Sequence, residues 1–126
     1  MNKTGKETEK ETEKTIGAII EGIRKIKGKE ITIIDLSSID HTECEYFIIC
    51  HGNSNTQVDA IAHSVEETTE EVTGEKVWHR DGYRNAIWIL LDYGNIMVHV
   101  FQKDARDFYN LESLWADAKI TKIEDN

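Results

Sequence analysis

Apolar residues recur at three- and four-residue intervals in two segments of this chain, which is the spacing of one buried face of a helix. The first segment predicts a helix over about residues 15–27 that stops at Gly28. The second begins after Ser54, which has capping-box spacing with Gln57, and ends near Gly74. The expected buried faces consist of Ile16, Ile19, Ile20, Ile23 and Ile26 in the first helix and Val58, Ile61, Ala62, Val65 and Val72 in the second.

Other apolar runs predict strands, because they are short and rich in β-branched residues. The clearest are residues 31–36 and residues 46–50, and the second is apolar on both faces, as expected at the centre of a sheet. Residues 76–79 give a weaker strand signal. Residues 103–118 form short helical turns with apolar positions at Phe108, Leu111, Leu114 and Trp115. Helices and strands without a regular repeat indicate an α/β (α+β) fold with a single mixed sheet flanked by helices.

The most regular pattern is a hairpin over residues 88–101, WILLDYGNIMVHVF. Gly94 and Asn95 fit a two-residue turn, so paired positions are expected to sum to 189. Because side chains alternate along each strand, the hairpin has two different faces. The aliphatic face, expected in the core, carries Ile87, Ile89, Leu91, Tyr93, Ile96, Val98 and Val100. The other face pairs Trp88 with Phe101, Leu90 with His99, and Asp92 with Met97.

This second face has two interpretations. In the first, the C-terminal segment covers it, and His99 is a hydrogen-bonded histidine beneath Tyr109 or Trp115. In the second, the face is partly open, and aromatic anchors bordered by an acid and a histidine have the composition of an interface hot spot. An exposed Trp–Phe pair would reduce solubility unless a partner covered it, so the choice decides whether the face is a binding site.

Charge narrows the class of partner. The chain has 24 Asp and Glu against 15 Lys and Arg, a net charge of −9. Residues 1–14 contain four lysines and four glutamates, so the whole excess lies on residues 15–126. Phosphate contacts dominate affinity for nucleic acids, so we expect no direct DNA binding and at most peripheral contact with RNA. A basic protein is the better electrostatic match.

The N-terminal segment KETEKETEK has no apolar face, so residues 1–14 are expected to be a solvated tail of frayed helix or disordered chain. It lacks the apolar core of a secretory signal, and no stretch approaches the roughly 20 apolar residues that span a bilayer. Cys44 and Cys50 give neither a disulfide framework nor a zinc pattern. These features predict a cytoplasmic protein without membrane association.

One loop has an enzyme-like pattern. In CHGNSN a strand, a glycine turn and a helix start are adjacent, and amides at a helix N-terminus can bind phosphate. The Gly52–Ser54 loop therefore supports an alternative function, a nucleotide-binding or nucleotidyltransferase-like enzyme. Against it, metal-binding carboxylates are needed on the strand after the loop, whereas Glu43 and Glu45 precede the glycine.

No set of catalytic residues is convincing in the sequence. The residue types of a Ser–His–Asp catalytic triad are present in Ser54, His99 and Asp92, but no nucleophile-elbow pattern surrounds the serine. Cys50 with His51 is an unsupported thiol–imidazole pair, and the five histidines do not cluster. We therefore expect no enzyme activity, no catalytic residue, no metal and no cofactor.

Three segments, in their order, closely resemble the ribosomal silencing factor family, also called Iojap-like: GKEITIIDLSSI, YFIICHGNSNTQVDAIAHSVEE and WILLDYGNIMVHVFQKDARDFYNLESLW. The resemblance covers about residues 15–118, which we expect to be the domain, between tails at 1–14 and 119–126. The sequence departs from the family at Glu45 and Asn110, where Asp is common. The family implies a nucleotidyltransferase-like fold without known transferase activity.

The same resemblance implies a translational repressor that binds the large ribosomal subunit at the ribosomal protein numbered fourteen. Occupying that surface would stop the small subunit from joining when nutrients are scarce. Free protein is also expected to be able to form a homodimer through the same aromatic face. The expected partner-binding residues are Trp88, Leu90 and Phe101 as anchors, Asp92, Glu112 and Asp117 as charges facing basic side chains, and His99 and Tyr109 as orienting or hydrogen-bonding groups.

Overall fold

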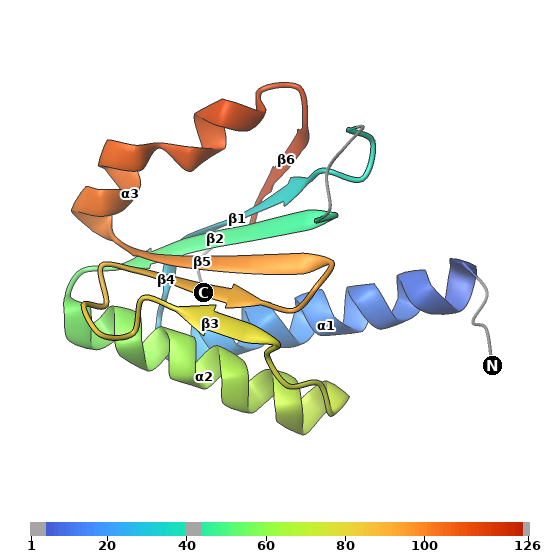
Figure 1. The fold of residues 1–126 in the computed structure, drawn as a ribbon, viewed down its shortest axis with the longest axis horizontal. Helices are drawn as coiled ribbons and strands as arrows, with labels where there is room; N and C mark the ends of the chain where they lie inside the picture. The colour runs from blue at the N-terminus through green and yellow to red at the C-terminus, as the bar shows by residue number, and fades with distance from the viewer. Residues whose placement is uncertain (1–4, 40–43, 125–126) are drawn as a thin grey trace.

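The structure, a computed structural model, describes residues 5–39 and 44–124. Two long helices lie on one side of a six-stranded sheet, and a shorter helical segment arches over the other side (Figure 1). The predicted fold class, with a single mixed sheet flanked by helices, is confirmed. The elements are α1 (Gly5–Lys25), β1 (Lys29–Asp35), β2 (Tyr46–Gly52), α2 (Asn55–Thr73), β3 (His79–Asp81), β4 (Trp88–Asp92), β5 (Ile96–Gln102), α3 (Lys103–Tyr109), the 3-10 helix η1 (Leu111–Trp115) and β6 (Lys119–Lys122).

The strand order is β3-β4-β5-β2-β1-β6. Only β2 and β5 pair in parallel among the described strands, and the other neighbours are antiparallel. The prediction that β2 is central is confirmed, since it lies between β5 and β1. The strand expected over residues 76–79 instead begins at His79, with exposed residues throughout.

The hairpin register is confirmed at every pair from Trp88–Phe101 to Asp92–Met97. The amide of Tyr93 donates to the carbonyl of Ile96 at 2.9 Å and closes the turn, in which Gly94 has φ of +90°. Two residues expected in the core are instead exposed: Ile87, which precedes β4, at 43%, and Val72, in the last turn of α2, at 40%. Both lie where an element ends and its neighbours no longer cover it.

The inner face of the sheet, which faces α1 and α2, holds the aliphatic core. Its fully buried side chains come from both helices and from four strands, and they include Ile19, Ile23, Ile31, Ile48, Ile61, Val65, Ile89, Leu91, Ile96, Val98 and Val100. The two helices pack closely because Gly22 meets the backbone of α2, where an added Cβ would lie 2.8 Å from Cα of Val65. Aliphatic burial on this scale is the main source of stability for a small domain.

Helix α2 starts and stops where the sequence predicts. The Ser54 hydroxyl accepts a hydrogen bond from the Gln57 amide at 3.1 Å, as an N-cap should. At the other end Gly74 adopts φ of +78°, and its amide donates to the Glu70 carbonyl at 2.8 Å.

Helix α1 begins at Gly5 instead of residue 15. The buried stripe continues through threonines, because Thr12 and Thr15 are 8% and 3% exposed, and Thr12 Oγ1 accepts a hydrogen bond from Asn95 Nδ2 at 3.0 Å. At the other terminus, the expected tail includes β6, which pairs with β1. Residues 1–4 and 125–126 of the expected tails, and Glu43, lie outside the described residues. Within the described ranges, no helix is both long and apolar enough to cross a bilayer.

Candidate docking surface

Aromatic side chains gather on the outer face of the sheet, opposite α1 and α2. The Trp88 ring centroid lies 4.8 Å from that of Phe101 and 5.0 Å from that of Tyr109, which ends α3. Phe47 on β2 extends the cluster, with its centroid 4.7 Å from His99. The hairpin face predicted from alternation therefore continues onto α3 and across to the central strand.

His99 is held inside this cluster as a neutral hydrogen-bond acceptor. Its Nδ1 accepts a hydrogen bond from Trp88 Nε1 at 3.1 Å, so the ring proton lies on Nε2. Burial lowers the pKa of His99 from 6.5 to about 4. Protonation at Nδ1 would also place a donor against the Trp88 N–H, so the neutral ring is the one that orients the indole.

Burial corrects the expected exposure of one predicted anchor, Phe101, and of one predicted orienting group, His99. Phe101 is fully buried and His99 is 5% exposed, so neither offers contact area to a partner. The reason is the C-terminal segment: Tyr109 lies over Phe101 at 6.4 Å, and Trp115 lies against Phe47 at 5.8 Å, between centroids. The interpretation that this segment covers the face holds for these two residues, while Trp88 and Leu90 are only partly buried.

The three predicted acids differ in what their carboxylates do. Asp92 Oδ1 accepts a hydrogen bond from the Gly94 amide at 2.7 Å, so it stabilises the hairpin turn. Glu112 forms an ion pair with Arg106 at 2.7 Å and keeps only 23% of its side chain exposed. Asp117 is exposed. Of the three, Asp117 is the one best placed to face a basic partner.

The largest exposed apolar side chains of α3 and η1 were not among the predicted partner-binding residues. Phe108 is 81% exposed and Leu114 69% exposed, and Phe108 is in edge contact with the half-exposed Tyr109, at 5.1 Å between centroids. Because Tyr109 also contacts Trp88, these three rings form one accessible patch, which we call the docking surface (Trp88, Phe108, Tyr109). The sequence marked Phe108 only as an apolar position in a segment of short helical turns.

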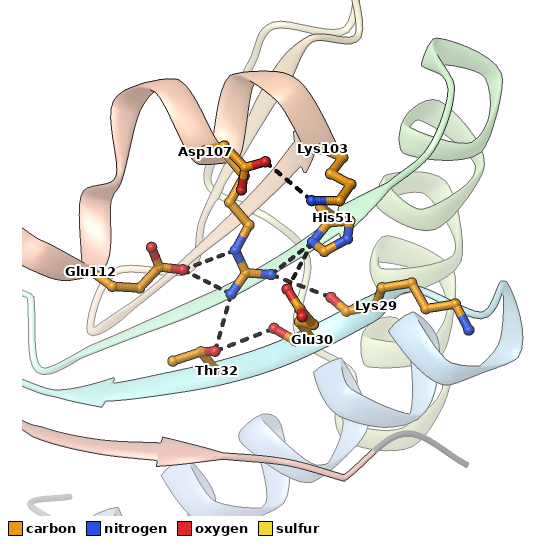
Figure 2. A network of polar contacts seen from close by, with 8 residues as sticks. Lys29, Glu30, Thr32, His51, Lys103, Asp107 and Glu112 are labelled. Carbon is orange, nitrogen blue, oxygen red and sulfur yellow. Dashed lines mark hydrogen bonds and ion pairs between the residues drawn. The ribbon is translucent and has the colours of Figure 1, made fainter.

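Arg106 anchors the segment that carries this docking surface. It is 7% exposed, and its guanidinium binds groups on η1, β1 and β2. Figure 2 labels these partners, among them Glu112, Thr32 and His51. Nε and Nη2 bind the carboxylate of Glu112, Nη2 also donates to Thr32 Oγ1 at 3.1 Å, and Nη1 donates to the Lys29 carbonyl at 3.3 Å. No pattern in the sequence indicates this role, because a single arginine in a polar helix is usually solvated.

His51 completes this Arg106 network from β2. Its Nδ1 lies 3.0 Å from Nη1 of Arg106, and its ring is buried. Burial and the Arg106 cation lower the pKa of His51, opposed by the carboxylate of Glu30 at 3.8 Å. A neutral His51 therefore accepts from the guanidinium.

A cleft of about 880 Å³ opens beside the network, between β1, β6 and the α3–η1 segment. Its lining includes Arg106, Glu112, Ile120 and Lys122. Each guanidinium nitrogen of Arg106 already has a partner within the protein, so the buried cation is not available to an anionic ligand.

The Gly52–Ser54 loop uses its polar groups internally. Ser54 Oγ accepts from the Gln57 amide, and the Asn53 amide donates to Gln57 Oε1 at 2.8 Å. A phosphate bound here would have to displace these contacts. In the parts of the chain that the structure describes, no group of three or more His, Cys, Asp or Glu residues could hold a metal ion.

The pairs considered from sequence do not form catalytic groups. His99 accepts from Trp88, and Asp92 is bound to the turn, so neither is oriented toward Ser54. Burial raises the pKa of the Cys50 thiol to about 12, and His51 is engaged by Arg106. A thiol with that pKa is not a nucleophile at neutral pH.

Comparison with known sequences shows similarity to the ribosomal silencing factors and to their Iojap relatives. A family model described as "Ribosomal silencing factor during starvation" matches residues 9–126. The chain is 41% identical over 98 residues to ribosomal silencing factor RsfS of Halalkalibacterium halodurans, covering 78% of this chain and 82% of that protein. It is 41% identical over 98 residues to RsfS of Bacillus subtilis, covering 78% and 81%. Chloroplastic Iojap of Zea mays is 35% identical over 100 residues, covering 79% of this chain and 42% of that protein.

Solved structures resemble most of this chain. A crystal structure from Bacillus halodurans has a TM-score of 0.73 and 34% sequence identity, and the match covers 89% of this chain and 98% of that chain. A crystal structure of a protein from Chromobacterium violaceum has a TM-score of 0.77 and 34% identity, covering 82% and 84%.

Proposed function

This chain belongs to the ribosomal silencing factor family, and from that premise we propose that it represses translation by binding the large ribosomal subunit through the ribosomal protein numbered fourteen. Bound there, it blocks joining of the small subunit when nutrients are limiting. The mechanism requires no catalytic step, because inhibition follows from occupancy of the joining surface.

The observation that carries the proposal is the docking surface. The ring of Tyr109 contacts the rings of both Trp88 and Phe108. Phe108 and Tyr109 nevertheless expose 81% and 51% of their surface. Partly exposed aromatic residues on a rigid support are typical of interface hot spots. Here the support is strand β4 on one side and the Arg106 network on the other.

Charge favours a protein partner over bare RNA. The chain carries a net charge of −9, and Asp117 and Asp107 are exposed near the C-terminal segment. Complementary charge speeds encounter with a basic protein and disfavours phosphate backbones. We therefore assign the affinity to the aromatic rings of the docking surface and the association rate to the exposed acids Asp107 and Asp117.

A subunit-joining assay tests the proposal. Purified large subunits are incubated with the protein, small subunits are added, and joined ribosomes are quantified on a sucrose gradient. Wild-type protein should reduce joining, whereas Tyr109→Ala should need about thirtyfold more protein for the same effect, as expected for a hot-spot loss of about 2 kcal/mol.

Val72→Ala is the control, because Val72 is an exposed apolar residue on α2, on the other side of the sheet. It should inhibit joining like the wild type. Equal inhibition by Tyr109→Ala and wild type, with both folded, would exclude the docking surface as the binding site. Light scattering of the free protein would show whether it also pairs through this surface.

A further inference from the structure

We propose that a second surface of this protein, a groove beside Trp78, binds a lysine- or arginine-containing segment of another protein. The groove has a volume of about 460 Å³ and lies between the N-terminal half of α1 and the β4–β5 turn. Its lining includes Glu11, Thr12, Glu45, Glu75, Trp78 and Asn95. We call it the Trp78 groove.

Trp78 is exposed but held in place. Its side chain is 79% exposed, which is unusual for the largest apolar residue type. Its amide donates to the Asp92 carbonyl at 2.9 Å, so its backbone continues the pairing of β3 with β4. The ring lies against the turn, because a Cβ added at Gly94 would be 3.0 Å from Cη2 of the indole. An ordered, open indole face is therefore available to a ligand.

The walls of the groove are also fixed. Asn95 in the turn donates from Nδ2 to Thr12 Oγ1 of α1 at 3.0 Å, which ties the turn to the helix. Thr12 is buried, so this half of α1 packs on the domain. The site is therefore preformed. Binding a ligand does not carry the entropic cost of ordering these side chains, which favours affinity.

The charges around the indole select a cation. Glu45 and Glu75 are exposed and line the groove. Lys76, the lysine in the lining, lies 3.8 Å from the Glu70 carboxylate on α2. A guanidinium or ammonium group can stack on the indole face and pair with a carboxylate at the same time. A phosphate backbone would be repelled, so a basic protein segment is the occupant that fits.

The Trp78 groove is separate from the docking surface. Trp88 begins β4, whereas the Trp78 amide bonds to Asp92, the last residue of β4, so the two tryptophans lie at opposite ends of the strand. Helix α1 also lies on the opposite side of the sheet from α3, the helix that carries Phe108 and Tyr109 of the docking surface (Figure 1). One molecule could therefore hold both partners at once.

Titration of the ¹⁵N-labelled full chain with a peptide of four Gly-Arg repeats tests this site directly. The indole N–H signal of Trp78, assigned from Trp78→Phe, should shift saturably, while the Trp88 indole, which is bonded to His99, should not. Trp78→Ala and Glu75→Lys should each weaken binding roughly two- to fivefold, in line with single cation–π and charge contacts. A peptide of four Gly-Glu repeats should cause no shift.

Glu67→Lys is the matched control, because it makes the same charge change at an exposed position on α2 outside the groove. It should change affinity less than Glu75→Lys. Equal losses in the two variants, or no shift of the Trp78 signal, would overturn the proposal. So would a dimer in light scattering that Trp78→Ala abolishes, because the occupant would then be a second copy. The test uses no ribosomes, so its outcome is independent of the proposed repressor function.

Discussion

The two faces of the sheet differ in chemistry and in how completely they are covered. The inner face is almost wholly aliphatic, and its central side chains, such as Ile48 and Ile89, are fully buried under α1 and α2. The outer face combines aromatic and polar side chains with buried aliphatic ones such as Ile34 and Ile49, and in the described part of the chain a short helix and a 3-10 helix cover it. Consequently Phe101 is sealed while Trp88 and Tyr109 retain accessible surface.

This difference separates the residues that hold the domain together from those that can bind. Aliphatic burial without polar atoms gives stability but no recognition, because nothing on that face reaches solvent. A partly covered aromatic face gives less stability per residue and leaves area for a partner. Substitutions on the inner face should therefore lower the free energy of unfolding more than they affect binding. Substitutions on the outer face should weaken binding more than they affect unfolding.

Ile48→Ala should have the largest effect on stability. Ile48 is fully buried on the central strand β2, and truncation there leaves a cavity that the packed helices cannot close. We expect a loss of about 4 kcal/mol in the free energy of unfolding, measured with urea. Leu90→Ala, on the partly buried outer face, should cost much less, and equal costs would contradict the distinction between the faces.

Arg106→Leu should come next and should affect both properties. The substitution leaves Glu112 without its cation and removes the bonds from α3 to Thr32 and Lys29, so we expect a loss of about 3 kcal/mol. Binding by the folded fraction should also weaken, because the anchor of the docking surface is lost. Lys103→Leu is the control: its pair with Asp107 is exposed, and its removal should leave unfolding almost unchanged.

Acidification should destabilise the outer face through His99. Its pKa is about 4 in the folded state and 6.5 when solvated, so the unfolded chain binds more protons in that interval. Stability is therefore complete above pH 6.5 and is lost as the pH falls toward 4, by about 2 kcal/mol between pH 7 and 5. The lowered pKa of His51 acts in the same direction.

His99→Phe should flatten this pH dependence in urea unfolding, because a phenyl ring does not titrate. Val72→Ala should leave it intact, since it replaces an exposed side chain and changes no titratable group. A slope unchanged by His99→Phe would mean that other groups cause it.

The elements that the sequence predicted well are those whose signals are local. The hairpin register followed from one turn and strict alternation, and α2 from a serine cap and a glycine stop. Helix α1 was predicted too short because threonines, not apolar residues, continue its buried stripe. Strand β6 carries no apolar alternation that a sequence would reveal, since it is an exposed edge strand paired with β1.

The docking surface was predictable only in part, for a physical reason. Alternation placed Trp88 and Phe101 on one face, but it did not indicate that the chain after β5 returns over both rings, seals Phe101 and covers Trp88 only in part. The exposure of Phe108 depends on how Arg106 orients α3, and Arg106 binds residues far away in sequence. Such long-range contacts leave no periodic signal.

Phe108→Ala should have the smallest effect on stability, because the ring is 81% exposed. It should nevertheless weaken binding, which makes it the cleanest probe of the outer face. Urea unfolding of the variant should match the wild type closely. A large loss of stability would place Phe108 in the core and contradict its assignment to the docking surface.

Co-sedimentation with purified ribosomal subunits at physiological salt tests the central claim most directly. The account predicts that the wild-type chain pellets with large subunits and not with small ones. At a subunit concentration that just saturates the wild type, Phe108→Ala and Tyr109→Ala should pellet much less, while Val72→Ala pellets normally. Pelleting with small subunits, or undiminished pelleting of both folded aromatic variants with large ones, would contradict it.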